Sequence, residues 1–236
     1  MTRRIIALLI SITAILVVFC GCNDSNNKEI DMNQKSSLLQ KQMPEVGDEI
    51  AVLHTTMGDI TLRFFPEYAP LAVENFITHA KNGYYDGVLF HRVMNEFMIQ
   101  GGDPEGTGAG GQSIWGRPFE DEFTPELSNF RGALSMANIG KPGTNKSQFF
   151  IVQNTGYADE QYDYISQVYG ISSEIIDQYK EMGGGAPWLD GAHTVFGHVI
   201  DGMDVVDAIA AVDVNGSSRP YEDVKIITID VIKYEG

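Results

Sequence analysis

Short runs of β-forming residues, separated by glycine-rich turns, recur through most of the chain and constrain its fold more than any other feature. The first two runs, Ile50–Thr55 and Ile60–Phe65, are divided by Met57-Gly58-Asp59, which predicts a β-hairpin. The later runs span residues 88–93, 97–100, 133–136, 149–153, 195–199 and 224–232. Many short strands with few helices predict a mainly β protein, either a closed barrel or a sandwich.

Two helices accompany these strands. One begins at Pro70, carries apolar residues with helical spacing, and stops at Asn82-Gly83, which is typical of an amphipathic helix. The other is predicted across Met203–Ala211, after Asp201-Gly202. Residues 159–182 have a separate helical pattern that breaks near Gly170, so we expect two short helices there, the second capped by Ser172 or Ser173.

Composition limits the possible partners. A chain of 236 residues with 43% hydrophobic content can bury a sizeable core, and one domain with extensions is the simplest division. The net charge of -16 makes nucleic acid a poor partner. Both cysteines, Cys20 and Cys22, lie near the N-terminus, so the globular part cannot form an internal disulfide.

The N-terminus has the form of a secretory signal, with Arg3-Arg4 before the apolar run Ile5–Phe19. As a helix this run reaches about 22 Å, short of the roughly 30 Å hydrocarbon core, which disfavours a permanent span. The segment Phe19-Cys20-Gly21-Cys22 resembles a bacterial lipoprotein signal. We therefore expect a signal peptide over residues 1–21 and a lipidated Cys22 that anchors the protein outside the cytoplasm, in the bacterial cell envelope. The alternative is a signal in which both cysteines are incidental.

Residues 22–47 continue from this cysteine as a polar stretch rich in Asn, Ser, Lys and Gln, and the globular domain is expected over residues 48–236. The polar stretch lacks a sustained apolar period and is predicted to be a flexible tether. A short helix over Ser36–Gln42, packed on the domain, is the alternative.

Several chemistries find little support in the sequence. The five histidines show no metal-ligand spacing, and no Gly-x-Ser-x-Gly elbow is present, so we expect no metal site. Residues 106–111 match a dinucleotide-binding glycine pattern, but residues 112–118 cannot continue as the required helix. Residues 140–147 resemble a P-loop, but they are followed by a predicted strand at Gln148–Ile151.

The stretch Phe90–Asp103 sets one cation, Arg92, among apolar and amide side chains and ends in a glycine pair before Asp103. Read as strands, it places Arg92, Met94, Met98 and Gln100 where they can share a face. Further blocks follow at residues 134–138, 147–152 and 188–197. With these blocks in this order, the chain resembles the cyclophilin family of peptidyl-prolyl cis/trans isomerases from about Glu49 to the C-terminus.

The resemblance implies a fold and an activity. The fold is a closed antiparallel barrel of eight strands, capped by a helix at each end. The activity is rotation of X-Pro bonds in folding proteins, without metal or organic cofactor. Proline-containing polypeptides and cyclosporin-type inhibitors are the implied partners, and we expect a monomer. A proline-peptide binding module or a holdase chaperone with incidental turnover is the main alternative, and a structural lipoprotein on an inactive fold is a more remote one.

The resemblance also implies roles for individual residues. Arg92 would act on the amide nitrogen, with Gln100 bracing its guanidinium. Phe97, Met98, Phe150 and Leu189 would receive the proline ring, although Phe150 also suits the core. The remaining substrate-binding residues would be Gly108, Ala137, Asn138, Gln148, Trp188 and His193. The insertion over residues 159–182 is either a helical elaboration beside the barrel or a lid or recruitment surface beside the groove.

Overall fold

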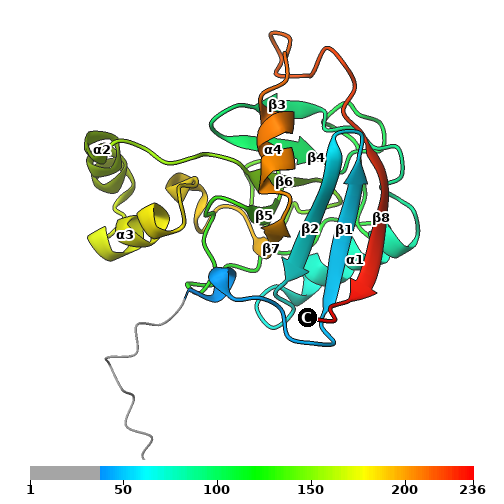
Figure 1. Ribbon diagram of the computed structural model, residues 1–236, viewed down its shortest axis with the longest axis horizontal. Helices are drawn as coiled ribbons and strands as arrows, with labels where there is room; N and C mark the ends of the chain where they lie inside the picture. Colours follow the sequence, from blue (N-terminus) through cyan, green and yellow to red (C-terminus); the bar gives the residue numbers. More distant parts are fainter. Residues whose placement is uncertain (1–37) are drawn as a thin grey trace, which may run out of the picture. The chain divides into compact units, whose positions relative to one another are not determined.

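In the computed structural model, which describes residues 38–236, eight strands form one continuous antiparallel sheet (Figure 1). The strands are β1 (Glu49–Thr55), β2 (Gly58–Phe64), β3 (Arg92–Met94), β4 (Met98–Gly101), β5 (Ala133–Met136), β6 (Phe149–Val152), β7 (Val195–Asp201) and β8 (Ile226–Lys233). Their order is β3-β4-β6-β5-β7-β2-β1-β8. The prediction of a mainly β fold with eight antiparallel strands is confirmed.

The sheet curls into a half-barrel, so the prediction of a closed barrel is wrong. The edge strands β3 and β8 do not pair, and the contact near them is an isolated bridge between Leu89 and Lys225. The reason is local. β3 has three residues, and Val93 at its centre donates its main-chain N–H to Ser218 O, 2.7 Å away, in the loop before β8. A loop therefore covers the strand edge that closure would have used.

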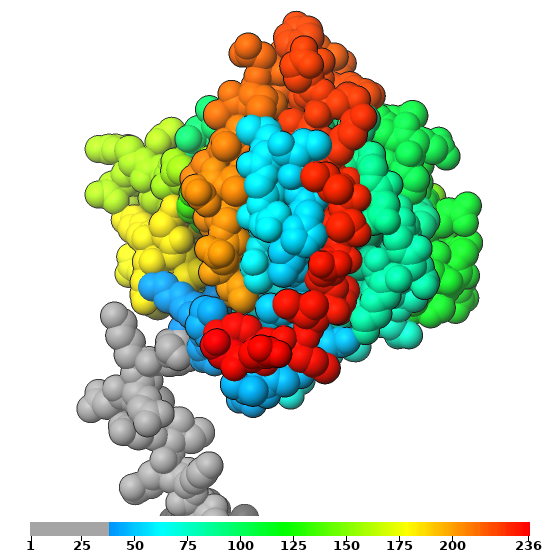
Figure 2. Space-filling view, turned by 45° about the vertical axis from the view of Figure 1, so that its right-hand side comes forward, coloured from blue at the N-terminus to red at the C-terminus, as the bar shows by residue number. Residues whose placement is uncertain are grey.

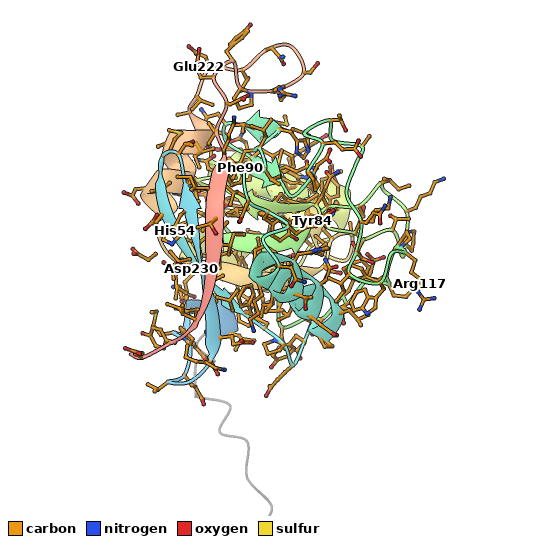
Figure 3. All side chains as sticks on the ribbon, turned by 90° about the vertical axis from the view of Figure 1, so that its right-hand side faces the viewer. His54, Tyr84, Phe90, Arg117, Glu222 and Asp230 are labelled. Carbon is orange, nitrogen blue, oxygen red and sulfur yellow. The ribbon has the colours of Figure 1, made fainter. Side chains whose placement is uncertain are left out.

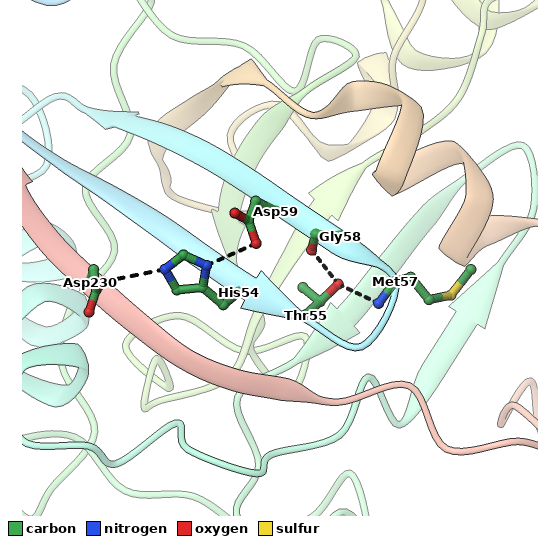
Figure 4. Close-up of polar contacts among 6 residues, drawn as sticks. All are labelled: His54, Thr55, Met57, Gly58, Asp59 and Asp230. Carbon is green, nitrogen blue, oxygen red and sulfur yellow. Dashed lines mark hydrogen bonds and ion pairs between the residues drawn. The ribbon is translucent and has the colours of Figure 1, made fainter.

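The predicted first hairpin is present and joins β8 side by side on one face of the domain (Figure 2). Thr55 fixes its turn, because its hydroxyl donates to Gly58 O at 2.6 Å and accepts from Met57 N at 3.1 Å. His54 lies between carboxylates of two neighbouring strands, 2.8 Å from Asp59 and 3.3 Å from Asp230 (Figure 4). The hydrogen bond to Asp59 raises the pKa of His54, so the three strands are joined by side chains as well as by the ladder.

Both predicted helices are confirmed as α1 (Pro70–Lys81) and α4 (Met203–Ala210). The carboxylate of Glu122, from a distant loop, accepts from the first-turn N–H groups of Leu71 and Ala72 at 3.0 and 2.9 Å. A negative charge at a helix N-terminus is favourable. Phe76 of α1 is buried in the core against four aromatic rings, those of Phe64, Tyr85, Phe149 and Phe196, at centroid distances of 5.2–5.6 Å. Figure 3 shows α1 against the sheet.

The insertion forms the two short helices expected, α2 (Asp159–Tyr169) and α3 (Ser173–Glu181). Ser172 caps α3 by accepting from Ile175 N, and Gly170 ends α2 at a φ of 67°. A small apolar cluster joins Tyr162, Ile176 and Tyr179 of the insertion to Phe130, which precedes β5. It leads into a 3-10 turn, η2 (Pro187–Leu189).

The end of the predicted tether belongs to the folded domain. Residues Leu39–Lys41 form a 3-10 turn, η1, and Gln40 within it is 3% exposed. Its side chain accepts from Ser128 N at 2.9 Å and donates to Ser128 O at 3.0 Å. The described part of this segment thus matches the alternative of a short packed helix. The predicted signal peptide, Cys22 and the rest of the tether lie outside the described residues. Among residues 38–236, no helix has both the length and the apolar character needed to span a bilayer.

Candidate active site

The β3–β4 hairpin places the predicted cation. Arg92 pairs with Gln100 across the hairpin and Met94 pairs with Met98, so the four residues share a face as the alternation predicted. The turn between them reverses at Glu96, whose φ is 56°. Arg92 Nη1 donates to Gln100 Oε1 at 3.1 Å and Nη2 donates to Met94 Sδ at 3.1 Å. The guanidinium is therefore held from two sides.

A chain of amides continues this support. Gln100 Nε2 donates to Gln148 Oε1 at 3.0 Å, and Gln148 Nε2 donates to Gly110 O at 2.9 Å. Both amide ends of Gln100 and of Gln148 are thus engaged within the protein. Gln148 links the support of Arg92 to the glycine-rich loop, and a direct contact of its side chain with substrate would have to share these bonds.

The predicted apolar residues gather beside Arg92. They belong to one cluster, which includes Met98 of β4, Phe150 of β6, Trp188 and Leu189 of η2, and the residues next to β4 and β5, Phe97 and Ala137. Met98 and Phe150 are 1% and 4% exposed, so both act as core as well as pocket floor. Phe97 is half-buried, and its ring lies 5.9 Å from the Arg92 guanidinium and 5.9 Å from the ring of Trp188.

His193 closes one side of this cluster. Its ring stands edge-on to Phe150 at 5.2 Å, and its Nδ1 lies 2.9 Å from Met136 O. Because a carbonyl oxygen can only accept, the hydrogen is assigned to Nδ1 and Nε2 is left as an acceptor. Burial lowers the pKa of His193, so the ring is neutral near pH 7 and suited to orienting a ligand group.

Asn138 follows Ala137 at the end of β5. Its side chain is used internally, with Nδ2 donating to Ala192 O at 2.8 Å and Oδ1 accepting from Gly140 N at 2.9 Å. Within residues 38–236, the main-chain N–H and C=O of Asn138 have no hydrogen-bond partner. They are free to bind an extended peptide, which is the role the resemblance implies.

Asp103, for which no role was predicted, organises the loop that carries Gly108. Its fully buried carboxylate accepts from the N–H groups of Glu105, Thr107, Gly108 and Gly110 at 2.7–3.2 Å. Burial alone would raise the pKa of Asp103, but these donors outweigh burial and lower it. The available signal was an Asp between the Gly101-Gly102 pair and the glycine-rich run that begins at Gly106.

A second missed group connects the insertion to the site. Tyr179 of α3 is fully buried and donates to Asp190 Oδ2 at 2.7 Å, while Asp190 Oδ1 accepts from Asn129 N and Nδ2 at 2.8 and 2.9 Å. Asp190 directly follows Trp188 and Leu189 in the chain. The insertion therefore helps to hold the segment that carries three predicted site residues.

The nucleotide-binding patterns are not realised. Residues 112–118 form turns rather than a helix, and residues 149–152 form β6. Among the residues that the structure describes, no cluster of His, Cys, Asp or Glu could hold a metal ion.

Two cavities differ in how they relate to the predicted site residues. One of about 220 Å³ is bounded by Arg92, Gln100 and Gly108 together with His91 and Arg219. A larger one of about 470 Å³ lies between the N-terminal segment and the start of α1, and none of the predicted site residues lines it. Geometry favours the smaller cavity, because the braced guanidinium of Arg92 lines it and the ring of Phe97, a member of the apolar cluster, lies 5.9 Å from that guanidinium.

Known proteins resemble this chain over its folded part. Residues 50–231 match the family model described as cyclophilin type peptidyl-prolyl cis-trans isomerase. A Staphylococcus aureus protein that bears the provisional name peptidyl-prolyl cis-trans isomerase is 52% identical over 193 residues, 82% of this chain and 96% of that protein. A similarly named protein of Staphylococcus saprophyticus is 50% identical over 188 residues, 79% and 94% of the two chains.

Solved structures agree with this likeness. The crystal structure of a Cryptosporidium parvum cyclophilin type peptidyl-prolyl cis-trans isomerase has a TM-score of 0.64 and 33% identity, covering 79% of this chain and 98% of that one. Another structure of that protein was determined in the presence of the dipeptide Ala-Pro. It has a TM-score of 0.63 and 33% identity, covering 78% and 99% of the two chains.

Proposed function

The chain belongs to the cyclophilin-type peptidyl-prolyl cis-trans isomerases, and we propose that it uses Arg92 to accelerate X-Pro rotation in proteins that fold outside the cytoplasm. The isomerase activity follows from the family. The assignment of roles to single residues and the extracytoplasmic setting are our proposals.

The reaction makes and breaks no covalent bond. The C–N bond loses its double-bond character and rotates over about 18–20 kcal/mol, which takes tens of seconds or more without a catalyst. Shortening this to milliseconds requires a factor of about 10⁴–10⁵, or roughly 5–7 kcal/mol. Charge placed where the twisted amide develops electron density supplies energy of this order together with positioning.

Arg92 carries the proposal because of how it is held. In the planar amide the nitrogen lone pair is delocalised, and on twisting it becomes localised. A guanidinium aimed at that nitrogen therefore stabilises the twisted form more than the planar one. Gln100 and Met94 brace the guanidinium, and within the described residues no carboxylate pairs with it. Its charge is left for the substrate.

The apolar cluster strengthens this effect. Phe97, Leu189 and Phe150 receive the proline ring and exclude water, which lowers the local dielectric around the charge. Asn138 binds the substrate main chain on one side while the other side rotates. His193 and Trp188 border the depression formed by Arg92 and the apolar cluster, which we call the trough. Cyclosporin-type inhibitors are expected to compete for it.

A proline-limited refolding assay on full-length protein tests the assignment. We expect Arg92→Ala to lower kcat/KM by about 10²–10³, the effect of removing one preorganised electrostatic donor, while the affinity for a proline peptide changes less than about threefold. Arg117→Ala removes an equal charge from an exposed loop residue, labelled at the edge of the domain in Figure 3, and serves as the control. Circular dichroism of both variants checks folding.

The outcomes separate the candidate functions. Equal losses of affinity and catalysis would favour a proline-peptide binding module, and unchanged catalysis in Arg92→Ala would refute the role of this residue. Protection of an unfolded protein without any rate enhancement by the wild type would favour a holdase.

The proposed location rests on the N-terminal sequence. Arg3-Arg4, the apolar run Ile5–Phe19 and Gly21-Cys22 support export and lipidation of Cys22 in a bacterial cell envelope. We expect the intact mass of membrane-extracted protein to correspond to a chain that begins at Cys22 and bears acyl chains. A Cys22→Ser variant should be released from membranes, and a full-length unmodified mass would contradict the proposal.

A further inference from the structure

Aromatic rings continue from the candidate active site onto the insertion. The ring of Trp188 lies 5.9 Å from Phe97, 6.0 Å from Tyr157 and 6.4 Å from Tyr169. Phe97 is at the same time 5.9 Å from the Arg92 guanidinium. We call Phe97, Trp188, Tyr157 and Tyr169 the aromatic strip.

The strip is partly open to solvent. Phe97, Tyr157 and Trp188 are half-buried, and Tyr169 at the end of α2 is 55% exposed. The helix itself is held by other residues, because Tyr162 and Ile165 are the buried members of α2. A continuous row of partly exposed aromatic rings beside a binding site is typical of a surface that binds a partner.

We propose that the aromatic strip binds an aromatic or large aliphatic side chain of the same polypeptide whose X-Pro bond lies at Arg92. This inference rests on the proposed function and adds a second binding site for the substrate. Three steps of about 6 Å lead from Arg92 through Phe97 and Trp188 to Tyr169. An extended chain advances about 3.3 Å per residue, so a side chain within about five residues of the proline reaches Tyr169.

The chemistry of the occupant follows from two observations. First, the strip is continuous with the trough, so a chain that fills one is already close to the other, and the second contact gains from a high effective concentration. Second, α2 carries Asp159, Glu160 and Asp163 on turns that face away from its buried side. A segment of unfolded protein with apolar side chains suits this surface, and an acidic segment does not.

The insertion is also fixed relative to the trough, which a binding platform requires. The hydrogen bond from Tyr179 to Asp190 and the contact of α2 with η2 join the two. For this reason deletion of residues 159–182 would disturb the segment that carries Trp188, and single surface substitutions are the cleaner test.

The test uses full-length protein and peptides with one proline. One peptide carries Trp five residues before the proline, a second carries it five residues after, and a third has Ser at both places. We expect the wild type to show a kcat/KM about two- to tenfold higher for one of the Trp peptides than for the Ser peptide, the gain typical of one aromatic contact. Tyr169→Ser should abolish this gain, and Tyr169→Phe should retain it.

Tyr164→Ser is the matched control. Tyr164 lies on the same helix and is 66% exposed, but makes no ring contact with Trp188. The Ser peptide should be turned over equally by wild type and Tyr164→Ser. Equal rates of the wild type on all peptides, or equal losses in Tyr169→Ser and Tyr164→Ser, would overturn the inference. Inactivity of the wild type on every peptide would instead refute the proposed function on which it rests.

Discussion

Replacement of Asp103 by Asn should destabilise the domain strongly, although the two side chains have the same shape. Asp103 Oδ2 accepts from Thr107 N, Thr107 Oγ1, Gly108 N and Gly110 N, and Oδ1 accepts from Glu105 N. The best placement of an Asn amide puts its oxygen where Asp103 Oδ2 lies, and its NH₂ group then faces the N–H of Glu105. One hydrogen bond is then lost and four lose their charged acceptor.

The expected loss is about 2–4 kcal/mol, because hydrogen bonds to a buried charge contribute about 1.5–3 kcal/mol each and the neutral oxygen retains part of that. Urea denaturation measures it. With a slope of about 2 kcal/mol per molar, the midpoint should fall by about 1–2 M. Glu105→Gln changes the net charge equally in the same loop, but its exposed side chain lacks these bonds, so its midpoint should change little.

The pH dependence gives a second check. The N–H donors hold the pKa of Asp103 below its ordinary value of 3.8. A carboxyl with a lowered folded pKa stabilises the fold above the unfolded value of about 3.9 and loses that contribution as pH falls through the folded value. The difference between wild type and Asp103→Asn should thus be full at pH 7 and shrink only below about pH 4. A loss under about 1 kcal/mol at pH 7, or one matched by Glu105→Gln, would refute the reasoning.

Three further outcomes are expected. Tyr179→Phe removes a buried donor to Asp190 and should lower the free energy of unfolding, measured by thermal unfolding, by about 1–3 kcal/mol. Its kcat/KM should also fall, because the segment after Trp188 loosens. No change in either quantity would contradict the role of this bond in holding that segment. Burial lowers the pKa of His193 below 6.5, so NMR should show the neutral ring as the majority form at pH 6.5, and stability should fall only as pH drops through the unfolded value toward the folded one. Gln40→Ala leaves the buried N–H of Ser128 without its acceptor, while Ser128 O keeps the N–H of Phe130, and should cost about 1–3 kcal/mol; a cost under about 0.5 kcal/mol would show that the N-terminal turn is dispensable.

The strands and main helices were predictable because each depends on local pattern. Apolar alternation located the β runs, and Pro70 marked the start of α1. Closure was not predictable in this way, because it depends on which distant segment reaches the edge of β3. There Ser218 takes the N–H of Val93, although the two lie far apart in sequence. Gln40 was missed for a similar reason, since a polar residue in a polar stretch gives no sign that its partner is Ser128.

The candidate site shows the same division. Arg92 and Gln100 stand out as a cation and an amide within one short apolar stretch, and their pairing follows from strand register. The contact of Tyr179 with Asp190 joins an inserted helix to a loop, and neither residue belongs to a pattern of its own. Asp103 lies at the end of the recognised stretch, but its role depends on the following residues folding back onto it.

The bond between Tyr179 and Asp190 has a consequence for protein engineering. A chimera that grafts residues 159–182 onto a shorter relative would leave the grafted tyrosine without its acceptor unless that scaffold also supplies an aspartate beside the groove tryptophan and an asparagine in place of Asn129. The insertion is therefore transferable only as a module of three separate chain segments. Homologues that lose one of the three should be found to have lost the others.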